Sequence, residues 1–256
     1  MTTRIEKDPL GEKAVPADAL YGIQTLRAVE NYPISGLRPL PAFVDAVIQI
    51  KKAAALTHKE TGRLEAKPAA GIAAAATEGL AGHHRNRANE LLGGQRGAYA
   101  PVHPNDHVNM AQSTNDVIPT AMRLATLATL PPLLESMDRL AKAFLAKGRE
   151  FDPIIKSGRT HLQDATPIRL GQEFTAYGHT VARHRAKLVE AARWVRALGI
   201  GGTAVGTGIN ADERFGPKVA RELSRLTGFR FESGANYFEN MSAQDSAVEL
   251  SGQLRV

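Results

Sequence analysis

The sequence of 256 residues predicts an all-α protein, with a small N-terminal helical domain followed by the first part of a long-helix bundle. Two stretches repeat apolar residues in alternating steps of three and four, the spacing of one face of a long helix. The first stretch comprises Leu127, Leu130, Leu134, Met137, Ala141 and Phe144, and the second Phe174, Tyr177, Val181, His184, Leu188, Ala191, Val195 and Leu198. Such seams pack long helices side by side.

The N-terminal region contributes shorter helices. Phe43, Val44, Val47, Ile48, Ile50, Lys51 and Ala54 outline an amphipathic helix that ends near Gly62. The Ala-rich stretch "KPAAGIAAAATEGLAG", residues 67–82, predicts another short helix because alanine has the highest helix propensity. We place the domain boundary between residues 1–115 and 116–256.

A helix start is predicted at "QSTNDVIP", residues 112–119, where four polar side chains precede an apolar run. Ser, Thr, Asn and Asp all accept hydrogen bonds from the free N–H groups of a first helical turn. Pro131 and Pro132 interrupt the seam that follows, so we expect a kink or a restart of the helix there.

Between the two seams, "IIKSGRTHLQDATPIRLGQ" predicts an extended excursion from the bundle, because β-branched residues flank a turn-forming cluster. After the second seam, "LGIGGTAVGTGIN" is glycine-rich. A dinucleotide fingerprint needs a preceding strand, so a helix C-cap and a loop are the better interpretation. "FGPKVARELSRLTGF" then predicts an amphipathic helix with Pro217 in its first turn, and the chain stops within a further helical pattern.

Composition narrows the function classes. The formal net charge is +6 and the pI about 9.6, but aromatics are only 5% and the basic residues are interleaved with apolar ones at helical spacing. We therefore expect no nucleic-acid partner, and a basic surface equally suits small dianionic substrates. Cysteine is absent, the N-terminus lacks a signal peptide's apolar core, and no apolar run approaches membrane-spanning length. We predict a cytoplasmic protein without membrane contact.

The strongest candidate site is again "QSTND". One helix needs one cap, and here Ser113, Thr114 and Asn115 stand with Asp116 in a row. Taken alone, a cap is the simpler interpretation, but a helix N-terminus with extra hydroxyl and amide groups also suits a carboxylate. Thr160 and His161 adjoin a predicted turn, where a lone histidine is more often structural.

Metal sites are not predicted. His103 and His107 have the spacing of a helical metal pair, but Pro104 should prevent the required helical turn. His83 and His84 have no partners at ligand spacing, and His184 lies on an apolar seam. We therefore expect neither a metal nor a cofactor.

Several long motifs resemble the aspartase/fumarase superfamily, in the order in which that family carries them. They are "RIEKDPLGEKAVPADALYGIQTLRAVENYPIS", "KKAAAL", "PNDHVNMAQSTNDVIPTA", "GRTHLQDATPIRLGQEF" and "GGTAVGTGIN". "TLRAVENYPIS" favours aspartate ammonia-lyase, whereas "NYFENMSAQDSAVELSG" is more similar to fumarate hydratase.

The resemblance implies an all-α lyase that assembles as a homotetramer, with active sites that draw on three subunits. It implies reversible elimination of ammonia from L-aspartate to give fumarate. By motif, Ser113, Thr114 and Asn115 would bind the carboxylate and amino groups of a dicarboxylate, and Thr160 and His161 the other carboxylate.

Two departures from the family pattern weaken this expectation for the chain alone. A Gly-Thr-Ser loop and an Asn-Met-Asn motif are missing, which indicates an internal deletion near residues 82–86, and the mobile loop with the base serine is also missing. No catalytic base is therefore assigned, and we expect weak or no activity. Fumarate hydratase activity and a non-catalytic helical fragment that assembles with partners remain as alternatives.

Overall fold

A computed structural model describes residues 2–80 and 86–255 and is mainly helical, as predicted. The predicted deletion near 82–86 thus lies almost wholly outside the described residues. The described part forms two compact units, Met1–Ala125 with Ala197–Ser242, and Thr126–Arg196 with Ala243–Val256. These bounds differ from the predicted domains, because helix α5 (Thr114–Glu150) passes from the first unit into the second and residues 197–242 join the first.

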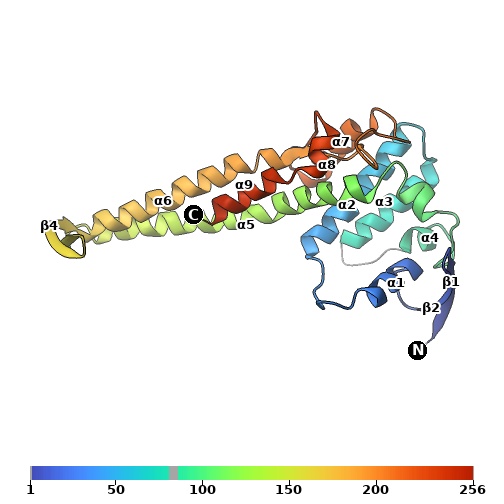
Figure 1. The fold of residues 1–256 in the computed structure, drawn as a ribbon, viewed down its shortest axis with the longest axis horizontal. Coiled ribbons are helices and arrows are strands. Elements are labelled where there is room, and N and C mark those ends of the chain that lie inside the picture. Colours follow the sequence, from blue (N-terminus) through green and yellow to red (C-terminus); the bar gives the residue numbers. More distant parts are fainter. Residues whose placement is uncertain (1, 81–85, 256) are drawn as a thin grey trace. The chain divides into compact units, whose positions relative to one another are not determined.

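The first unit is built on three packed helices (Figure 1). Helix α2 (Pro41–Glu60) packs against α3 (Ala66–Leu80) and α7 (Phe215–Thr227). All three helices were expected from the sequence. Shorter elements complete the unit: α1 (Ile23–Asn31), α4 (Arg87–Leu91), α8 (Tyr237–Ser242) and a parallel pair, β5 (Ala197–Leu198) with β6 (Glu232–Ser233). Its core includes Ala55, Leu64, Ala69, Ile72, Ala88 and Val102.

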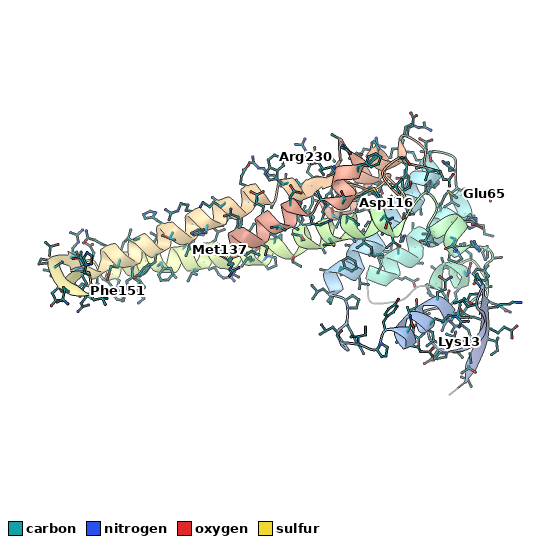
Figure 2. The ribbon with its side chains drawn as sticks, in the orientation of Figure 1. Lys13, Glu65, Asp116, Met137, Phe151 and Arg230 are labelled. Carbon is teal, nitrogen blue, oxygen red and sulfur yellow. The ribbon has the colours of Figure 1, made fainter. Side chains whose placement is uncertain are left out.

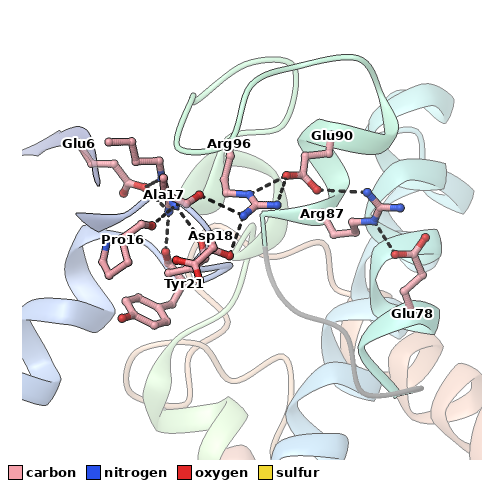
Figure 3. A network of polar contacts seen from close by, with 11 residues as sticks. Glu6, Pro16, Ala17, Asp18, Tyr21, Glu78, Arg87, Glu90 and Arg96 are labelled. Carbon is pink, nitrogen blue, oxygen red and sulfur yellow. Dashed lines mark hydrogen bonds and ion pairs between the residues drawn. The ribbon is translucent and has the colours of Figure 1, made fainter. Parts of the chain in front are cut away.

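The chain begins with a hairpin that the sequence did not predict, β1 (Thr3–Asp8) paired antiparallel with β2 (Gly11–Pro16). Buried and exposed side chains alternate along β1 in the reverse of the usual pattern, since the apolar Ile5 is 65% exposed and the charged Glu6 is buried. Arg4 explains this arrangement, because its guanidinium donates to the carbonyl oxygens of Pro16, Ala17, Ala19 and Tyr21 and to Glu6. Of these partners, Glu6, Pro16, Ala17 and Tyr21 are labelled in Figure 3. These polar contacts hold the hairpin together with the fully buried side chain of Val15 in β2.

Helix α5 (Thr114–Glu150) is 37 residues long and runs through Pro131 and Pro132 without a restart. Of the expected kink or restart, the restart was wrong. Both prolines are exposed, while Leu127 and Leu130 before them and Ala141 beyond them are buried. Packing of one face thus keeps the helix continuous despite two missing N–H donors. Contrary to the expectation, one apolar stretch of α5 is long and apolar enough to cross a membrane by length and composition, and 44% of that stretch is buried within the protein.

In the second unit, α5 packs against α6 (Leu170–Ala191) through most of the predicted seams. The second seam was predicted too long, because α6 ends before Val195 and Leu198, which lie in a 3₁₀ turn and in β5. Phe144 contacts Phe174 and Tyr177 at ring-centroid distances of 6.1 and 5.7 Å, and Arg185 pairs with Asp138. Between the two helices lies the predicted excursion, an antiparallel hairpin of β3 (Ile155–Thr160) and β4 (Gln163–Arg169). Helix α9 (Asp245–Leu254) packs against α6 and the short 3₁₀ turn Trp194–Arg196.

Candidate functional site

The predicted helix start is confirmed, since α5 begins at Thr114 with Ser113 as its N-cap residue. The Ser113 hydroxyl accepts a hydrogen bond from the Asn115 N–H at 3.2 Å, and the Ser113 N–H donates to Oδ1 of Asp116 at 2.9 Å. This arrangement is a variant of the capping box, in which Asp116 accepts from the N-cap N–H but the Ser113 hydroxyl accepts from the second rather than the third helical N–H. Two of the four polar side chains therefore complete the cap.

The other two polar side chains face solvent. Thr114 is exposed, and its hydroxyl has no hydrogen-bond partner among the residues that the structure describes. Asn115 is also exposed and donates its Nδ2 to the carbonyl oxygen of Ala204 at 2.7 Å, which leaves its Oδ1 available as an acceptor. The positive end of a long helix thus presents a hydroxyl and an amide oxygen that the helix itself does not use.

Asp116 is fully buried, and it connects the helix start to the glycine-rich segment (Figure 2). In addition to the Ser113 contact, its Oδ2 accepts hydrogen bonds from the N–H groups of Gly201 and Thr203 at 3.1 and 3.0 Å. Burial raises the pKa of the Asp116 carboxyl, and these three donors and the positive charge of Lys51 oppose that rise. Because Asp116 is out of reach of solvent, it cannot serve as a base for a bound substrate.

The glycine-rich segment is an integral part of this site, which the sequence interpretation missed. Gly201, Gly206 and Gly208 have φ values of 102°, 107° and 72°, which glycine adopts without strain. Thr203 has φ 58°, a conformation that costs a β-branched residue about 1–3 kcal/mol. In the sequence, only the pattern of glycines marked this segment, and that pattern did not indicate that the segment contacts Asp116.

Lys51 supports the chain just before the helix. Its ammonium group donates to Oε1 of Gln112 at 2.9 Å, and Nε2 of Gln112 donates to the carbonyl oxygens of Val108 and Met110. The "KKAAAL" and "QSTND" motifs therefore meet in the first unit. This contact places a positive charge close to the capping box, where an anion would also be favoured.

Thr160 and His161 belong to the second unit, at the tip of the β3–β4 hairpin, and both are exposed. Thr160 pairs with Gln163, and His161 and Leu162 form the two-residue turn with φ values of 49° and 61°. Two positive φ values define a type I′ turn, which normally selects Asn-Gly. A histidine and a leucine that is 92% exposed are therefore present at some cost in folding free energy.

The histidines near Pro104 do form a helical turn, contrary to the expectation, since Pro104–Val108 is a single π-type turn. Nδ1 of His103 accepts from the N–H groups of Asn105 and Asp106, and Nδ1 of His107 accepts from the N–H of His103. Both rings therefore cap backbone groups. Within the described residues, no group of three or more His, Asp or Glu side chains has the arrangement of a metal site.

Comparison with known proteins places these features in context. Residues 11–256 match the protein family described as Lyase. The chain is 42% identical to fumarate hydratase class II from Ralstonia nicotianae, over all of this chain and 61% of that relative. It is 40% identical to aspartate ammonia-lyase from Bacillus subtilis, over 99% of this chain and 58% of that relative.

Two solved structures resemble the fold closely. The fumarate lyase:delta crystallin of Brucella melitensis superposes with a TM-score of 0.96 at 42% identity, over 99% of this chain and 61% of that one. The class II fumarase of Schistosoma mansoni gives a TM-score of 0.94 at 31% identity, over 98% and 62%. The chain therefore spans about three-fifths of the length of these relatives.

The alignment with the Ralstonia relative also bears on the predicted deletion. It extends over 281 positions, whereas this chain has 256 residues. That relative must therefore carry internal residues without a counterpart in this chain. Their location near residues 82–86 remains a prediction.

Proposed function

The chain belongs to the lyase family within the aspartase/fumarase superfamily, and we propose that it acts in an elimination that releases fumarate from a four-carbon dicarboxylate. The observation that carries the proposal is the start of α5, where Thr114 and Asn115 keep free polar groups beyond those required for capping. Proton removal beside a carboxylate creates additional negative charge, and preorganised donors at a helix N-terminus stabilise such charge.

We assign binding roles to the predicted residues. Ser113, Thr114 and Asn115 bind one end of the substrate, with the Asn115 Oδ1 accepting a hydrogen from the group at the reacting carbon. In an oligomer, Thr160 and His161 of another subunit bind the second carboxylate. The imidazole at a strained turn supports this role, because the turn geometry itself would favour a different residue. No general base is assigned.

The leaving group is ammonia or water. The segment Thr25–Ser35 favours an aspartate ammonia-lyase. Hydratases among the relatives are 40 to 43% identical to the chain and ammonia-lyases 39 to 40%, so identity does not separate the two activities. Both eliminations need the same contacts to two carboxylates, so the site supports either reaction.

Product analysis separates the alternatives. The purified chain is incubated in turn with L-aspartate, L-malate and fumarate plus ammonia, and the products are identified by NMR. Fumarate from aspartate supports an ammonia-lyase, fumarate from malate supports a hydratase, and no product from either supports a non-catalytic fragment. Binding of fumarate, measured by calorimetry, tests the carboxylate site even where turnover is absent.

Variants connect the result to the site. Asn115→Ala removes the Oδ1 acceptor and should weaken the binding or turnover of L-aspartate or L-malate about tenfold or more, because the amino or hydroxyl group at the reacting carbon loses its partner. Asn31→Ala, at the exposed end of α1, removes the same chemical group elsewhere in the first unit and serves as the control. Equal effects of the two substitutions would contradict the assignment.

A further inference from the structure

Asp116 occupies a position that neither capping nor substrate binding explains completely. A capping box needs one acceptor for the Ser113 N–H, and Oδ1 provides it. The second oxygen, Oδ2, accepts two more N–H groups, from Gly201 and Thr203, which are 85 and 87 residues distant in sequence. A buried carboxylate is costly to desolvate, so its retention at this point indicates a task beyond the helix start.

That task involves the residue adjacent to each of these contacts. Asn115 precedes Asp116 on the helix, and Ala204 follows Thr203 in the glycine-rich segment. The Asn115 Nδ2 and the Ala204 carbonyl oxygen meet at 2.7 Å. Because the three N–H contacts of Asp116 hold both segments, they also set the distance between these two groups.

We propose that Asp116 is a positioning residue, which fixes the Asn115 amide by holding residues 201–204 against the first turn of α5. With Nδ2 committed to Ala204, the amide presents Oδ1 to the exterior and cannot rotate to present its donor. Thr203, which keeps a positive φ, and Gly201 donate the N–H groups that make this arrangement. The inference deepens the proposed function, on which its ligand-binding consequence rests.

A double-mutant cycle tests the connection. Binding of L-aspartate and of L-malate, whose amino or hydroxyl group can donate to Oδ1 of Asn115, is measured by calorimetry for the wild-type chain, Asp116→Asn, Asn115→Ala and the double variant. Asn replaces one carboxylate oxygen by an N–H donor, so at least one of the three backbone contacts is lost. We expect each single substitution to weaken binding about tenfold, and the double variant to bind no more weakly than Asn115→Ala, because Asp116 acts through Asn115.

A purely structural role predicts a different outcome. If Asp116 only stabilises the fold, the two losses are independent and the double variant loses about a hundredfold, which overturns the proposal. Unchanged binding in Asp116→Asn overturns it as well. Asp45→Asn, at an exposed position of α2, removes the same charge within the first unit and should leave binding unchanged.

A second measurement needs neither a ligand nor a variant. In the wild-type chain, NMR signals of the Ser113, Gly201 and Thr203 N–H groups should shift with pH at one common midpoint, because all three donate to one carboxyl. Separate midpoints overturn the proposal, even if Asp116→Asn fails to fold. If the wild-type chain does not bind fumarate but the three signals titrate together, the carboxylate-binding part of the proposed function fails and the positioning contact stands.

Discussion

At the scale of single residues, a buried polar side chain of the first unit, His58, connects three of its segments. His58 is fully buried in α2, hydrogen-bonded through Nε2 to the Met110 carbonyl oxygen at 2.9 Å. Its ring stacks on Phe215 of α7 at 4.6 Å between centroids with an interplanar angle of 11°. The residue thus ties α2 both to α7 and to the segment that leads into the candidate site.

His58 should make stability depend on pH. Burial lowers the pKa of its imidazole below the ordinary value of about 6.5. At pH values above 6.5, His58 is neutral in both the folded and unfolded states. As the pH falls below 6.5, the unfolded chain binds a proton that the folded chain does not, so the free energy of unfolding decreases. Urea unfolding between about pH 7.5 and 5.5 measures the change.

The variant His58→Gln isolates this contribution. Glutamine retains a donor for Met110 but cannot titrate, so its unfolding should vary less with pH, although the lost stacking lowers stability by about 1–3 kcal/mol at every pH. A pH dependence identical to that of the wild-type chain would contradict the assignment.

At the scale of elements, glycines set how closely α5 and α6 approach. A Cβ added at Gly171, in the first turn of α6, would lie 2.2 Å from the Gly148 carbonyl oxygen and 2.6 Å from Cα of Asp152. Both neighbours are backbone atoms, so no side-chain rotation can relieve the overlap. The close approach of these two helices therefore depends on glycine at this position.

Two Gly-to-Ala substitutions should have opposite effects. Gly171→Ala should destabilise the chain by about 1–3 kcal/mol through overpacking. Gly252→Ala should stabilise it by about 0.5–1 kcal/mol, because Gly252 lies within α9 with no atom within 4 Å of its added Cβ. Denaturant midpoints of the two variants provide the comparison. Effects of the same sign would show that the helix interface is more adaptable than the structure indicates.

The β3–β4 hairpin offers a test that separates stability from function. Leu162→Gly relieves a left-handed conformation that is costly for leucine, and should stabilise the hairpin by about 1 kcal/mol while His161 remains. His161→Asn also suits the type I′ turn but removes the imidazole. We expect thermal unfolding to show no loss of stability in either variant, and only His161→Asn to weaken fumarate binding. Equal binding in both would remove His161 from the site.

At the scale of the whole molecule, the helices of the second unit leave large apolar side chains in contact with solvent. Leu133 and Leu140 on α5 are 38% and 47% exposed, Tyr177 on α6 is 50% exposed and Val248 on α9 is 69% exposed. Exposed apolar patches of this kind indicate surfaces that bind other chains. They support the proposed self-association, for which the resemblance implies a tetramer.

Association should be measurable for this chain. Light scattering should give a mass above the 27.5 kDa of the monomer, and Leu140→Lys should lower it by placing a charge in the apolar surface. Lys142→Glu changes the charge of a neighbouring exposed residue and serves as the control. A monomer mass at all concentrations would contradict the proposal.

The helical class, most of the two bundle seams and the start of α5 follow from the sequence alone, because each depends on residues within a few turns of one another. The sequence also indicated Ser113, Thr114, Asn115, Thr160 and His161 as site residues, through motifs whose roles remain proposals. Local spacing was enough for the hairpin between the long helices but not for its turn, because the predicted cluster Gln163–Pro167 lies in β4 and the turn is His161–Leu162.

How distant segments combine became clear only from the folded chain. The Asp116 carboxylate joins N–H groups 85 and 87 residues away, and no local pattern specifies such a pairing. The same holds for the first hairpin, where Arg4 binds carbonyl oxygens and Glu6 takes the buried position, and for α5, which packing carries through two prolines. Hydrogen bonds and packing between segments far apart in sequence overrode local propensity in each case, because they contribute free energy that appears only once the chain has folded.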